Sequence, residues 1–568
     1  MNTLKSISRF LRRVPEGVTI ILLFYFCFLP IISVIIYGVS ANASRFSVDS
    51  MARILMLLEN SLKLAFCTTV ISVSFAAIAT FALHRLKFRG RGFLRILMLL
   101  PLVNPSFVGS LSFIMLFGTR GLISHDLLGL SISPYGFHGV LFLQVMSFTT
   151  IAYLIISGSV NSTNIDLEDA ARNMGASEVH ILSRITFPMM LPEIAVASLL
   201  VFLSSMADFT TPVVIGGNFK TLASDLYVQI IGVYDMKTAS ITGIFLLVPC
   251  FLAFLIQERL SKKRKFSSDG VSAKNILYIH CPRSVKALFI GLTAILIFLF
   301  CLIFIFIFVG AFTKAWGHDY SFTLEHASAV LAAGFRQYLK PLRNSVVLAL
   351  VTGFATAALG TVLAYCVHQK KIVCSWLVDM MCLLPAAVPG ILFGIGYLVT
   401  FKYSLFGIGQ FILPAAPKIV LLGTTAIMYF ICIARQMNLS MKSCYALLDH
   451  IEPDIINAAY NLGAAPWYAT IRILVPMLKD AFMNAFLRIF SATMTTLGAI
   501  IFLILPKNKV LIQILFQITT NSKIGISCFV ALLMSATTLI IMLAIYGLAY
   551  HRDIIYNYRR KYSHGIRS

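Results

Sequence analysis

Two short polar segments interrupt an otherwise apolar sequence, and they resemble each other position by position. They read Asp169-Ala170-Ala171-Arg172-Asn173-Met174-Gly175 and Asn457-Ala458-Ala459-Tyr460-Asn461-Leu462-Gly463. A proline follows each glycine after thirteen residues, Pro188 in the first case and Pro476 in the second. Each segment therefore predicts a short helix that ends at its glycine, then a second helix, then a proline where the chain re-enters the membrane. The small alanine faces suit close docking of a partner protein.

No motif in the sequence predicts catalysis or metal binding. It contains no G-x-x-x-x-G-K-[ST] phosphate loop, no H-E-x-x-H, no EF-hand loop and no G-x-S-x-G elbow. The eleven cysteines are scattered and form no C-x-x-C pair. We therefore expect no catalytic residue, no metal and no cofactor in this chain, and any ATP to be used by a partner subunit.

Polar residues inside apolar runs are the candidates for a transport path. A charge near the membrane midplane is costly, so Asp208 should face the bundle interior or a water-filled path. A buried carboxylate paired with a serine or a backbone group is the alternative. Arg488 suits either a partner for an anionic group or a structural clamp, and Asn104 and Thr496 complete the candidate path. Prolines 101, 105, 385 and 389 free backbone carbonyls that line a cavity or only kink a helix.

The composition predicts that these residues are carried on membrane-spanning helices. Of 568 residues, 59% are hydrophobic and 12% are charged, well outside the range of soluble domains. Apolar runs of about twenty residues recur, and each is long enough to cross a bilayer. We predict an all-α polytopic membrane protein with twelve transmembrane helices, near residues 17–38, 60–84, 93–118, 136–159, 193–217, 238–257, 287–312, 343–367, 375–400, 418–437, 480–505 and 524–550.

Basic residues set the orientation. The formal charge of +24 does not imply nucleic acid, because lysine and arginine gather in alternate loops, as in the cytoplasmic loops of multispanning proteins. This alternation predicts that both termini are cytoplasmic. The small residues Ala41-Asn42-Ala43 resemble a signal-peptide cleavage site, but the apolar run before them is too long for one.

The two parts of the chain form an internal repeat. Pro101 and Pro385 lie 284 residues apart, as do Ser61 and Ser345, and the loop glycines lie 288 apart. We predict two six-helix halves, residues 1–257 with a loop near 160–192 and residues 287–568 with a loop near 440–479, joined by a basic cytoplasmic linker, 258–286. A parallel repeat of this kind places the transported molecule between the halves.

The first polar loop also differs in charge from its surroundings. It carries Asp166, Glu168, Asp169 and Glu178 against Arg172 and Arg184. A helix that lies on anionic lipid is rich in lysine and arginine, so the acidity favours a protein partner.

These loops resemble the EAA loops of binding-protein-dependent ABC importers. That pattern is Glu-Ala-Ala, three residues, Gly, nine residues, Ile, one residue, Leu-Pro. Here Asp169 and Asn457 stand at the glutamate position, and Phe187 and Val475 replace the leucine. The resemblance implies that the ATPase-coupling residues are Asp169, Ala170, Ala171, Gly175, Pro188, Asn457, Ala458, Ala459, Gly463 and Pro476, and that two copies of an ABC ATPase dock there.

A single chain with two such halves is similar to the fused permeases of the ferric-iron importer family. The segments Met206–Pro212 and Met494–Leu503 look like the fifth spans of that family. The resemblance implies a permease in the bacterial inner membrane, a soluble substrate-binding protein as second partner, and ferric iron as cargo. Fused permeases for phosphonates, sugar phosphates and thiamine are built alike. A secondary transporter driven by an ion gradient is the competing class, but it gives no reason for a repeated glycine loop.

Overall fold

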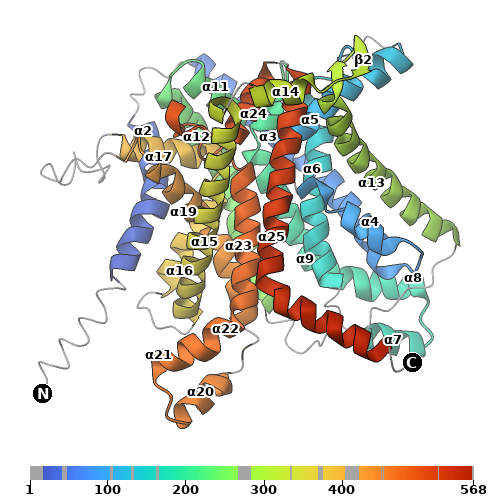
Figure 1. The fold of residues 1–568 in the computed structure, drawn as a ribbon, viewed down its shortest axis with the longest axis vertical. Helices are drawn as coiled ribbons and strands as arrows, with labels where there is room; N and C mark the ends of the chain where they lie inside the picture. Colours follow the sequence, from blue (N-terminus) through green and yellow to red (C-terminus); the bar gives the residue numbers. More distant parts are fainter. Residues whose placement is uncertain are drawn as a thin grey trace, which may run out of the picture.

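The computed structural model describes residues 17–40, 48–102, 107–129, 133–160, 165–265, 283–332, 335–368, 375–402, 421–448, 451, 453–521 and 523–565. Helices make up nearly all of it (Figure 1). Within these ranges, the strands are β1 (Thr313–Ala315) and β2 (Asp319–Phe322), which pair antiparallel as one small hairpin. The fold is therefore helical, as the composition predicts.

Eight helical segments in the described ranges are long and apolar enough to cross a membrane. They are Gly17–Val39 with α2 (Leu29–Val39), Asp49–Arg85 with α3 (Val48–Thr80), α6 (Phe137–Val160), Leu182–Ala207 with α9 (Phe187–Ala207), α12 (Met236–Lys265), α13 (Arg283–Ala311), Gln337–His368 with α15 (Lys340–His368), and α25 (Ile524–Gly565). A ninth candidate is the pair α16 (Ser375–Ala387) and α17 (Gly390–Phe401), which meet at an angle of 113° next to Pro389. Of the twelve transmembrane helices predicted from hydropathy, the described ranges thus contain eight as single long helices, or nine with the bent pair.

Several expected spans are shorter, broken or shifted. Region 93–118 contains α4 (Arg91–Leu97) and α5 (Val108–Phe117), and region 418–437 contains α19 (Ala426–Leu448). Region 193–217 breaks at Asp208, between α9 and α10 (Thr210–Ile215). Region 480–505 breaks at Thr496, where α23 (Lys479–Thr495) ends. An average of hydropathy along the sequence does not register such breaks, because the residues on both sides of them are equally apolar.

Two serines 284 residues apart make the same contact. The Ser61 hydroxyl accepts a hydrogen bond from the Leu222 amide, and the Ser345 hydroxyl accepts one from the Leu511 amide, each at 2.8 Å. These amides start the short apolar helices α11 (Leu222–Ile231) and α24 (Leu511–Thr520). The preceding asparagines repeat as well, since Asn60 donates to the Lys220 carbonyl and Asn344 to that of Lys509.

The helical segment Gly17–Val39 at the start of the chain and α13, the first helix after the linker, each pack against the opposite part of the chain. We call residues 17–265 the N-terminal part and residues 283–565 the C-terminal part. The Tyr397 hydroxyl on α17 donates to the Phe26 carbonyl at 2.7 Å, and the Phe26 ring stacks on Phe430 at 4.4 Å. Conversely, Ser112 on α5 donates to the Ile303 carbonyl of α13 at 2.6 Å. The two parts therefore interlock.

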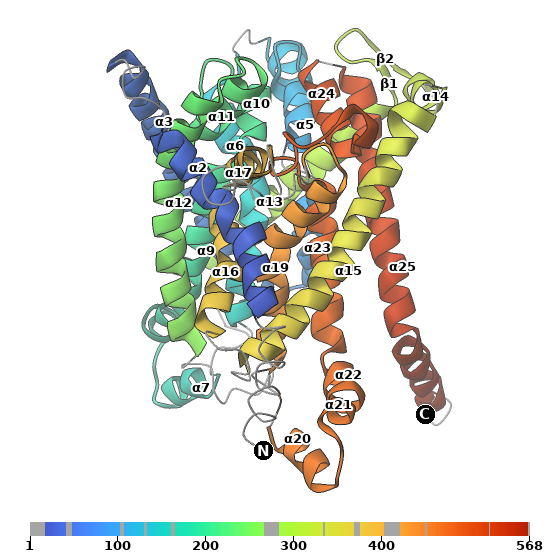
Figure 2. The same cartoon turned by 90° about the vertical axis from the view of Figure 1, so that its left-hand side faces the viewer.

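The polar loops lie together at one end of the molecule. Figures 1 and 2 show α7 (Ile165–Asn173) and α20 (Pro453–Asn461) at the lower end, away from the β-hairpin and α14 (Glu325–Ala332) at the upper end. Helix α12 continues to Lys265 and α13 begins at Arg283, so residues 266–282 of the predicted linker lie outside the described residues.

Candidate coupling loops and transport cavity

Both polar loops close with the same hydrogen bonds around a left-handed glycine. Gly175 has a φ of +84° and Gly463 one of +83°. In the first loop the Gly175 amide donates to the Arg172 carbonyl and the Ala176 amide to that of Ala171, both at 3.0 Å. The second loop repeats the pair, from Gly463 to Tyr460 at 2.9 Å and from Ala464 to Ala459 at 3.0 Å. This is a Schellman closure, which satisfies carbonyls at the end of each short helix.

The two adjacent alanines of each loop differ in exposure. Ala171 and Ala459 are buried against the rest of the loop, whereas Ala170 and Ala458 are exposed. Next to each glycine, Met174 is 82% exposed and Leu462 is 88% exposed. Each loop thus presents one small and one large apolar side chain to the outside. Single exposed apolar side chains are common on protein surfaces, so it is the matched position beside the two glycines that makes Met174 and Leu462 candidates for docking.

The second short helices and the prolines also lie where the sequence places them. Ser177 accepts a hydrogen bond from the His180 amide at 3.3 Å and so caps α8 (Glu178–Ile181). Pro466 opens α21 (Pro466–Ala469). Pro188 in α9 and Pro476 in α22 (Val475–Met477) each follow a π-helical segment, Leu182–Thr186 in the first loop and Thr470–Leu474 in the second.

The acidic side chains of the first loop are largely used within it. Arg172 donates to Asp169 at 2.7 Å and to Glu178 at 2.8 Å, and the hydrogen bond to the Glu178 carboxylate raises the pKa of the Arg172 guanidinium. Glu168 is fully buried. The acidity that favours a protein partner in the sequence is therefore mostly internal, and exposed Met174 is the stronger feature for docking.

Glu168 fixes the first loop to the membrane helices. Its carboxylate accepts two hydrogen bonds from the Arg85 guanidinium, at 2.9 and 2.8 Å, and a third from the Thr186 hydroxyl at 2.7 Å. Arg85 ends the π-helical segment Phe81–Arg85, and Thr186 precedes α9. Both charged side chains are buried, at 2% and 0% exposure. A bidentate pair of this kind holds its partners in one orientation.

The residue types of this network are not repeated at the equivalent positions of the second half. Ile456 and Leu474 lie 288 residues after Glu168 and Thr186, and Gln369 lies 284 residues after Arg85. Tyr460 and Pro466 similarly stand in place of Arg172 and Glu178. The two loops therefore share a backbone but not the Arg85–Glu168–Thr186 network, and in the second loop a buried Leu474 takes the place of Thr186.

A cavity of about 250 Å³ lies between the two parts of the chain. The N-terminal part contributes Phe107, Phe148, Ser204, Ala207, Asp208, Phe209 and Thr210, and the C-terminal part contributes Gly390, Ile391, Arg435, Thr495, Thr496, Leu497, Gly498 and Ala499. Asp208 and Thr496, two of the predicted path residues, thus meet at one site. Asn104 lies outside the described residues, and Arg488 is exposed and does not line the cavity.

Asp208 and Thr496 break their helices in the same way. They lie 288 residues apart. Asp208 has φ −79° and ψ 110°, and Thr496 has φ −77° and ψ 117°. Each amide then donates to the residue three positions earlier, Ser205 at 3.3 Å and Thr493 at 3.2 Å. The cavity is therefore lined by two equivalent helix ends.

The carboxylate of Asp208 is well provided with donors. Oδ1 accepts from the Thr210 amide at 3.1 Å, the Thr210 hydroxyl at 2.8 Å and the Thr211 amide at 3.2 Å. Oδ2 accepts from Gln144 Nε2 at 3.1 Å. The alternative of a carboxylate held by backbone and hydroxyl groups therefore applies, although Asp208 also lines the cavity.

Comparison with known proteins identifies the family. Residues 70–266 match the model of the binding-protein-dependent transport system inner membrane component. The ferric transport system permease protein FbpB of Actinobacillus pleuropneumoniae is 28% identical over 549 residues, which cover 93% of this chain and 76% of that protein. FbpB 1 of Haemophilus influenzae is 28% identical over 86% of this chain and 78% of its own length. The molybdenum transport system permease protein ModB of Mycobacterium tuberculosis is 31% identical over 201 residues, 34% of this chain and 75% of that protein.

The chain belongs to this family of inner membrane transport components. It is a multi-pass helical permease of an ABC transport system, and it resembles ferric permeases over most of its length. Partner ATPase and substrate-binding subunits are implied by the family.

Arg435 is a residue of the permease cavity that hydropathy and motifs do not reveal. It lies within α19 and donates from Nη1 to the Val388 carbonyl at 3.3 Å, next to the bend between α16 and α17. A side chain at Gly390 would collide with it, because a Cβ there would lie 2.8 Å from Nη1. The rule that intramembrane charges mark functional positions, applied to Asp208, would also have selected Arg435.

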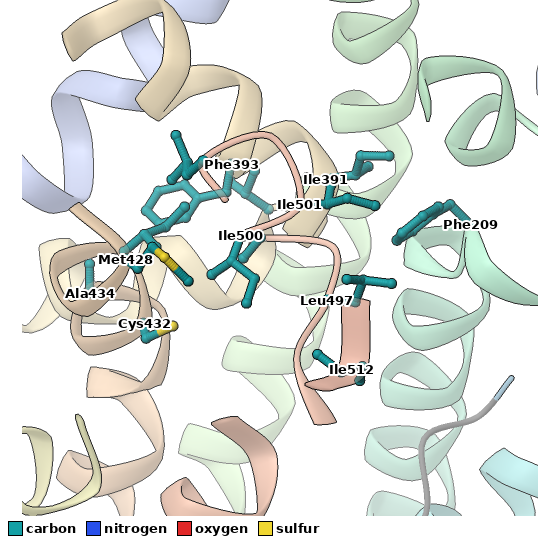
Figure 3. Close-up of a cluster of buried hydrophobic side chains, with 14 of the residues drawn as sticks. Phe209, Ile391, Phe393, Met428, Cys432, Ala434, Leu497, Ile500, Ile501 and Ile512 are labelled. Carbon is teal, nitrogen blue, oxygen red and sulfur yellow. The ribbon is translucent and has the colours of Figure 1, made fainter. Parts of the chain in front are cut away.

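Two aromatic residues of the cavity wall, Phe107 and Phe209, also contact α11 and α24. Phe209 lies 5.5 Å from Tyr227 on α11 and 6.0 Å from Phe516 on α24, and Phe107 lies 5.6 Å from Phe516. Figure 3 shows Phe209 of the N-terminal part facing Ile391 and Leu497 of the C-terminal part. The cavity wall is thus apolar on the side of Phe107 and Phe209, where the two parts of the chain meet.

Proposed function

We propose that this permease is the membrane subunit of an ATP-driven importer of ferric iron. A soluble binding protein delivers the cargo at the end that carries α14 and the β-hairpin. Two copies of an ABC ATPase bind at the opposite end, one at residues near 165–180 and one near 453–468. The permease itself binds no ATP and holds no cofactor. Both termini lie in the cytoplasm of the bacterium.

The matched pair of loops is the observation that carries this proposal. Their glycine φ angles, Schellman bonds and exposed apolar side chains repeat at an interval of 288 residues. Two equal docking elements at one end suit two equal ATPase copies. A secondary transporter has no use for them.

The same repetition supports two six-span halves with twelve membrane-crossing segments in all. Some of these segments are broken, as at Asp208 and Thr496, instead of continuous. Discontinuous helices at a cavity between repeats are typical of transporters. When ATP draws the ATPase copies together, the loops move with them, and the two halves rotate about the cavity.

The assignment of ferric iron as the substrate rests on the similarity to the two ferric permeases. Both ferric permeases named above align with more than four fifths of this chain. Phosphonates, sugar phosphates and thiamine remain the competing cargoes, since permeases for them share this plan.

A reconstituted complex tests the proposal. The permease, its ATPase and its binding protein are placed in liposomes, and uptake of radioactive Fe³⁺ is measured with and without ATP. A photo-reactive amino acid at Ala170 or at Ala458 should crosslink to the ATPase, because both positions are exposed on the coupling helices. The matched control is Leu324, which is also exposed and lies in the chain between β2 and α14, the elements at the other end (Figure 1).

Each result has a defined meaning. ATP-dependent iron uptake with crosslinks from both alanines and none from Leu324 supports the proposal. Crosslinks from neither alanine would remove the docking assignment. Uptake that continues without the ATPase would favour the gradient-driven class instead.

A further inference from the structure

We infer that Arg435 forms an oxyanion-binding site in the cavity, so that the cargo crosses with phosphate or carboxylate oxygen atoms on it. The inference rests on the proposed function and names the chemical form of the cargo. In this form ferric iron passes as a complex with an oxyanion and not as a bare ion.

The first argument is the state of the two charges in the cavity. Among the lining residues, Arg435 is the basic one and Asp208 the acidic one. Four donors already contact the Asp208 carboxylate, so it is held in place at the helix break. Asp208 therefore resembles a structural cap more than an open ligand.

Arg435 is in the opposite situation. A guanidinium offers five N–H donors and stays protonated in proteins. Within the described part of the chain, its polar contact is one hydrogen bond to the Val388 carbonyl. No described carboxylate forms an ion pair with it. The remaining donors are thus available at the cavity wall, where a planar fork fits two oxygens of a carboxylate or phosphate.

The cavity is also poorly suited to a bare trivalent cation. The described residues contain no group of three histidine, cysteine, aspartate or glutamate side chains that could hold a metal ion. A guanidinium beside the path would repel Fe³⁺, and the repulsion is strong where water is scarce. The oxygen ligands that iron needs must therefore arrive with it.

The size of the cavity permits this. Its 250 Å³ corresponds to roughly eight water molecules at about 30 Å³ each, enough for an ion with several ligand oxygens. The hydroxyls of Ser204, Thr495 and Thr496 add neutral polar groups around it. Gly390 keeps the wall beside Arg435 free of a side chain.

Doubly labelled transport tests the inference on the wild-type complex. Liposomes with permease, ATPase and binding protein receive ⁵⁵Fe³⁺ together with ³³P-phosphate or ¹⁴C-citrate, and both labels are counted inside. One of the anions should accumulate with iron in a fixed ratio. Iron that accumulates with neither labelled anion, in bicarbonate-free buffer, would overturn the inference and leave the proposed function intact.

Variants then assign the site to the side chain. Arg435→Gln should lower iron and anion uptake together by about 10- to 100-fold, the value of a charge-assisted hydrogen bond. Arg435→Lys keeps the charge without the fork and should retain part of the uptake. The control is Arg488→Gln, an arginine in the same part of the chain that is exposed and outside the cavity. Equal uptake by Arg435→Gln and wild type would refute the assignment.

Uptake of the labelled anion measured without iron distinguishes the oxyanion site from the proposed ferric function. ATP-dependent uptake of phosphate or citrate alone, with no iron movement under any condition, would end the ferric proposal and keep the oxyanion site.

Discussion

Arg85 holds Glu168 through two parallel hydrogen bonds of 2.9 and 2.8 Å, with both side chains buried. The pair joins the end of a long membrane helix to the first coupling loop. The equivalent positions in the second half hold Gln369 and Ile456, which cannot form this ion pair. Two loops with one backbone shape thus differ in this one attachment.

Removal of one partner from this pair should be costly. Glu168→Ala leaves Arg85 buried without its carboxylate, and we expect a loss of about 3–5 kcal/mol in the stability of this region. Thermal unfolding of the detergent-solubilised permease measures it. Asp169→Asn is the matched control on the same helix, since a half-exposed pair contributes less than about 1 kcal/mol.

The same pair permits a test by replacement. The double variant Arg85→Met, Glu168→Leu replaces the ion pair by apolar side chains of similar size and should recover much of the stability lost by Glu168→Ala. A double variant as unstable as the single one would show that the ions themselves are required.

Left-handed glycines give the second prediction. Nothing lies within 4 Å of a Cβ placed on Gly175 or Gly463, so a substitution strains the backbone alone. Valine at both positions should cost about 1–2 kcal/mol per loop and uncouple ATPase binding from transport, whereas asparagine should be tolerated. The ratio of cargo moved to ATP hydrolysed measures coupling. Gly547→Val, equally open but without a positive φ, is the control, and a normal ratio in the double valine variant would contradict the prediction.

The third prediction concerns the exposed apolar side chains Met174 and Leu462. Met174→Ala and Leu462→Ala remove apolar surface that the permease does not use internally. We expect each to weaken ATPase binding about tenfold, measured by co-purification at graded ATPase concentration, with unchanged thermal stability. Phe322→Ala, 75% exposed at the other end, should change neither quantity. Unaltered ATPase binding in the double variant would place the docking surface elsewhere.

Two variants of Asp208 separate the effect of its negative charge from the effect of its hydrogen bonds to the Thr210 and Thr211 amides. Asparagine retains an oxygen that accepts from the Thr210 and Thr211 amides, whereas leucine loses both contacts. Asp208→Asn should therefore keep most transport, and Asp208→Leu should lose it together with about 1–3 kcal/mol of stability from unsatisfied buried donors. Initial rates of uptake over a range of cargo concentrations check this. Equal loss in both variants would mean that the charge itself is needed.

The paired serines provide the last prediction. Ser61→Ala and Ser345→Ala each remove the acceptor for a buried amide at the start of α11 or α24. Each should cost about 1–2 kcal/mol, and the double variant should equal the sum, because the two serines share no hydrogen-bond partner. Denaturation of the three variants gives the values. Strongly unequal costs would show that the two contacts differ in spite of their geometry.

The sequence predicts the coupling loops well because their determinants are local. A left-handed glycine, a serine cap and a proline at the start of a helix act within a few residues, so Gly175, Ser177 and Pro466 define their own surroundings. The helical membrane class follows from composition for a similar reason, since apolar runs of that length have few other solutions.

Long-range features escape that reasoning. Glu168 is buried only because Arg85, 83 residues earlier, reaches it. Hydropathy also passes over the breaks at Asp208 and Thr496, since one polar residue scarcely changes an average. Arg435 gains its importance from the bend at Val388, which belongs to another segment.

The interlocked helices constrain the order in which the two parts can pack during synthesis. Helix α13 packs on α5 of the N-terminal part, but it lies at residues 283–311 and leaves the ribosome after all of that part. The Phe26 segment, made first, waits for Tyr397 and Phe430. Neither part can therefore complete its packing before the other is under way. A ribosome that stalls in the linker would leave an incomplete bundle with uncovered apolar surface, a natural substrate for membrane quality control.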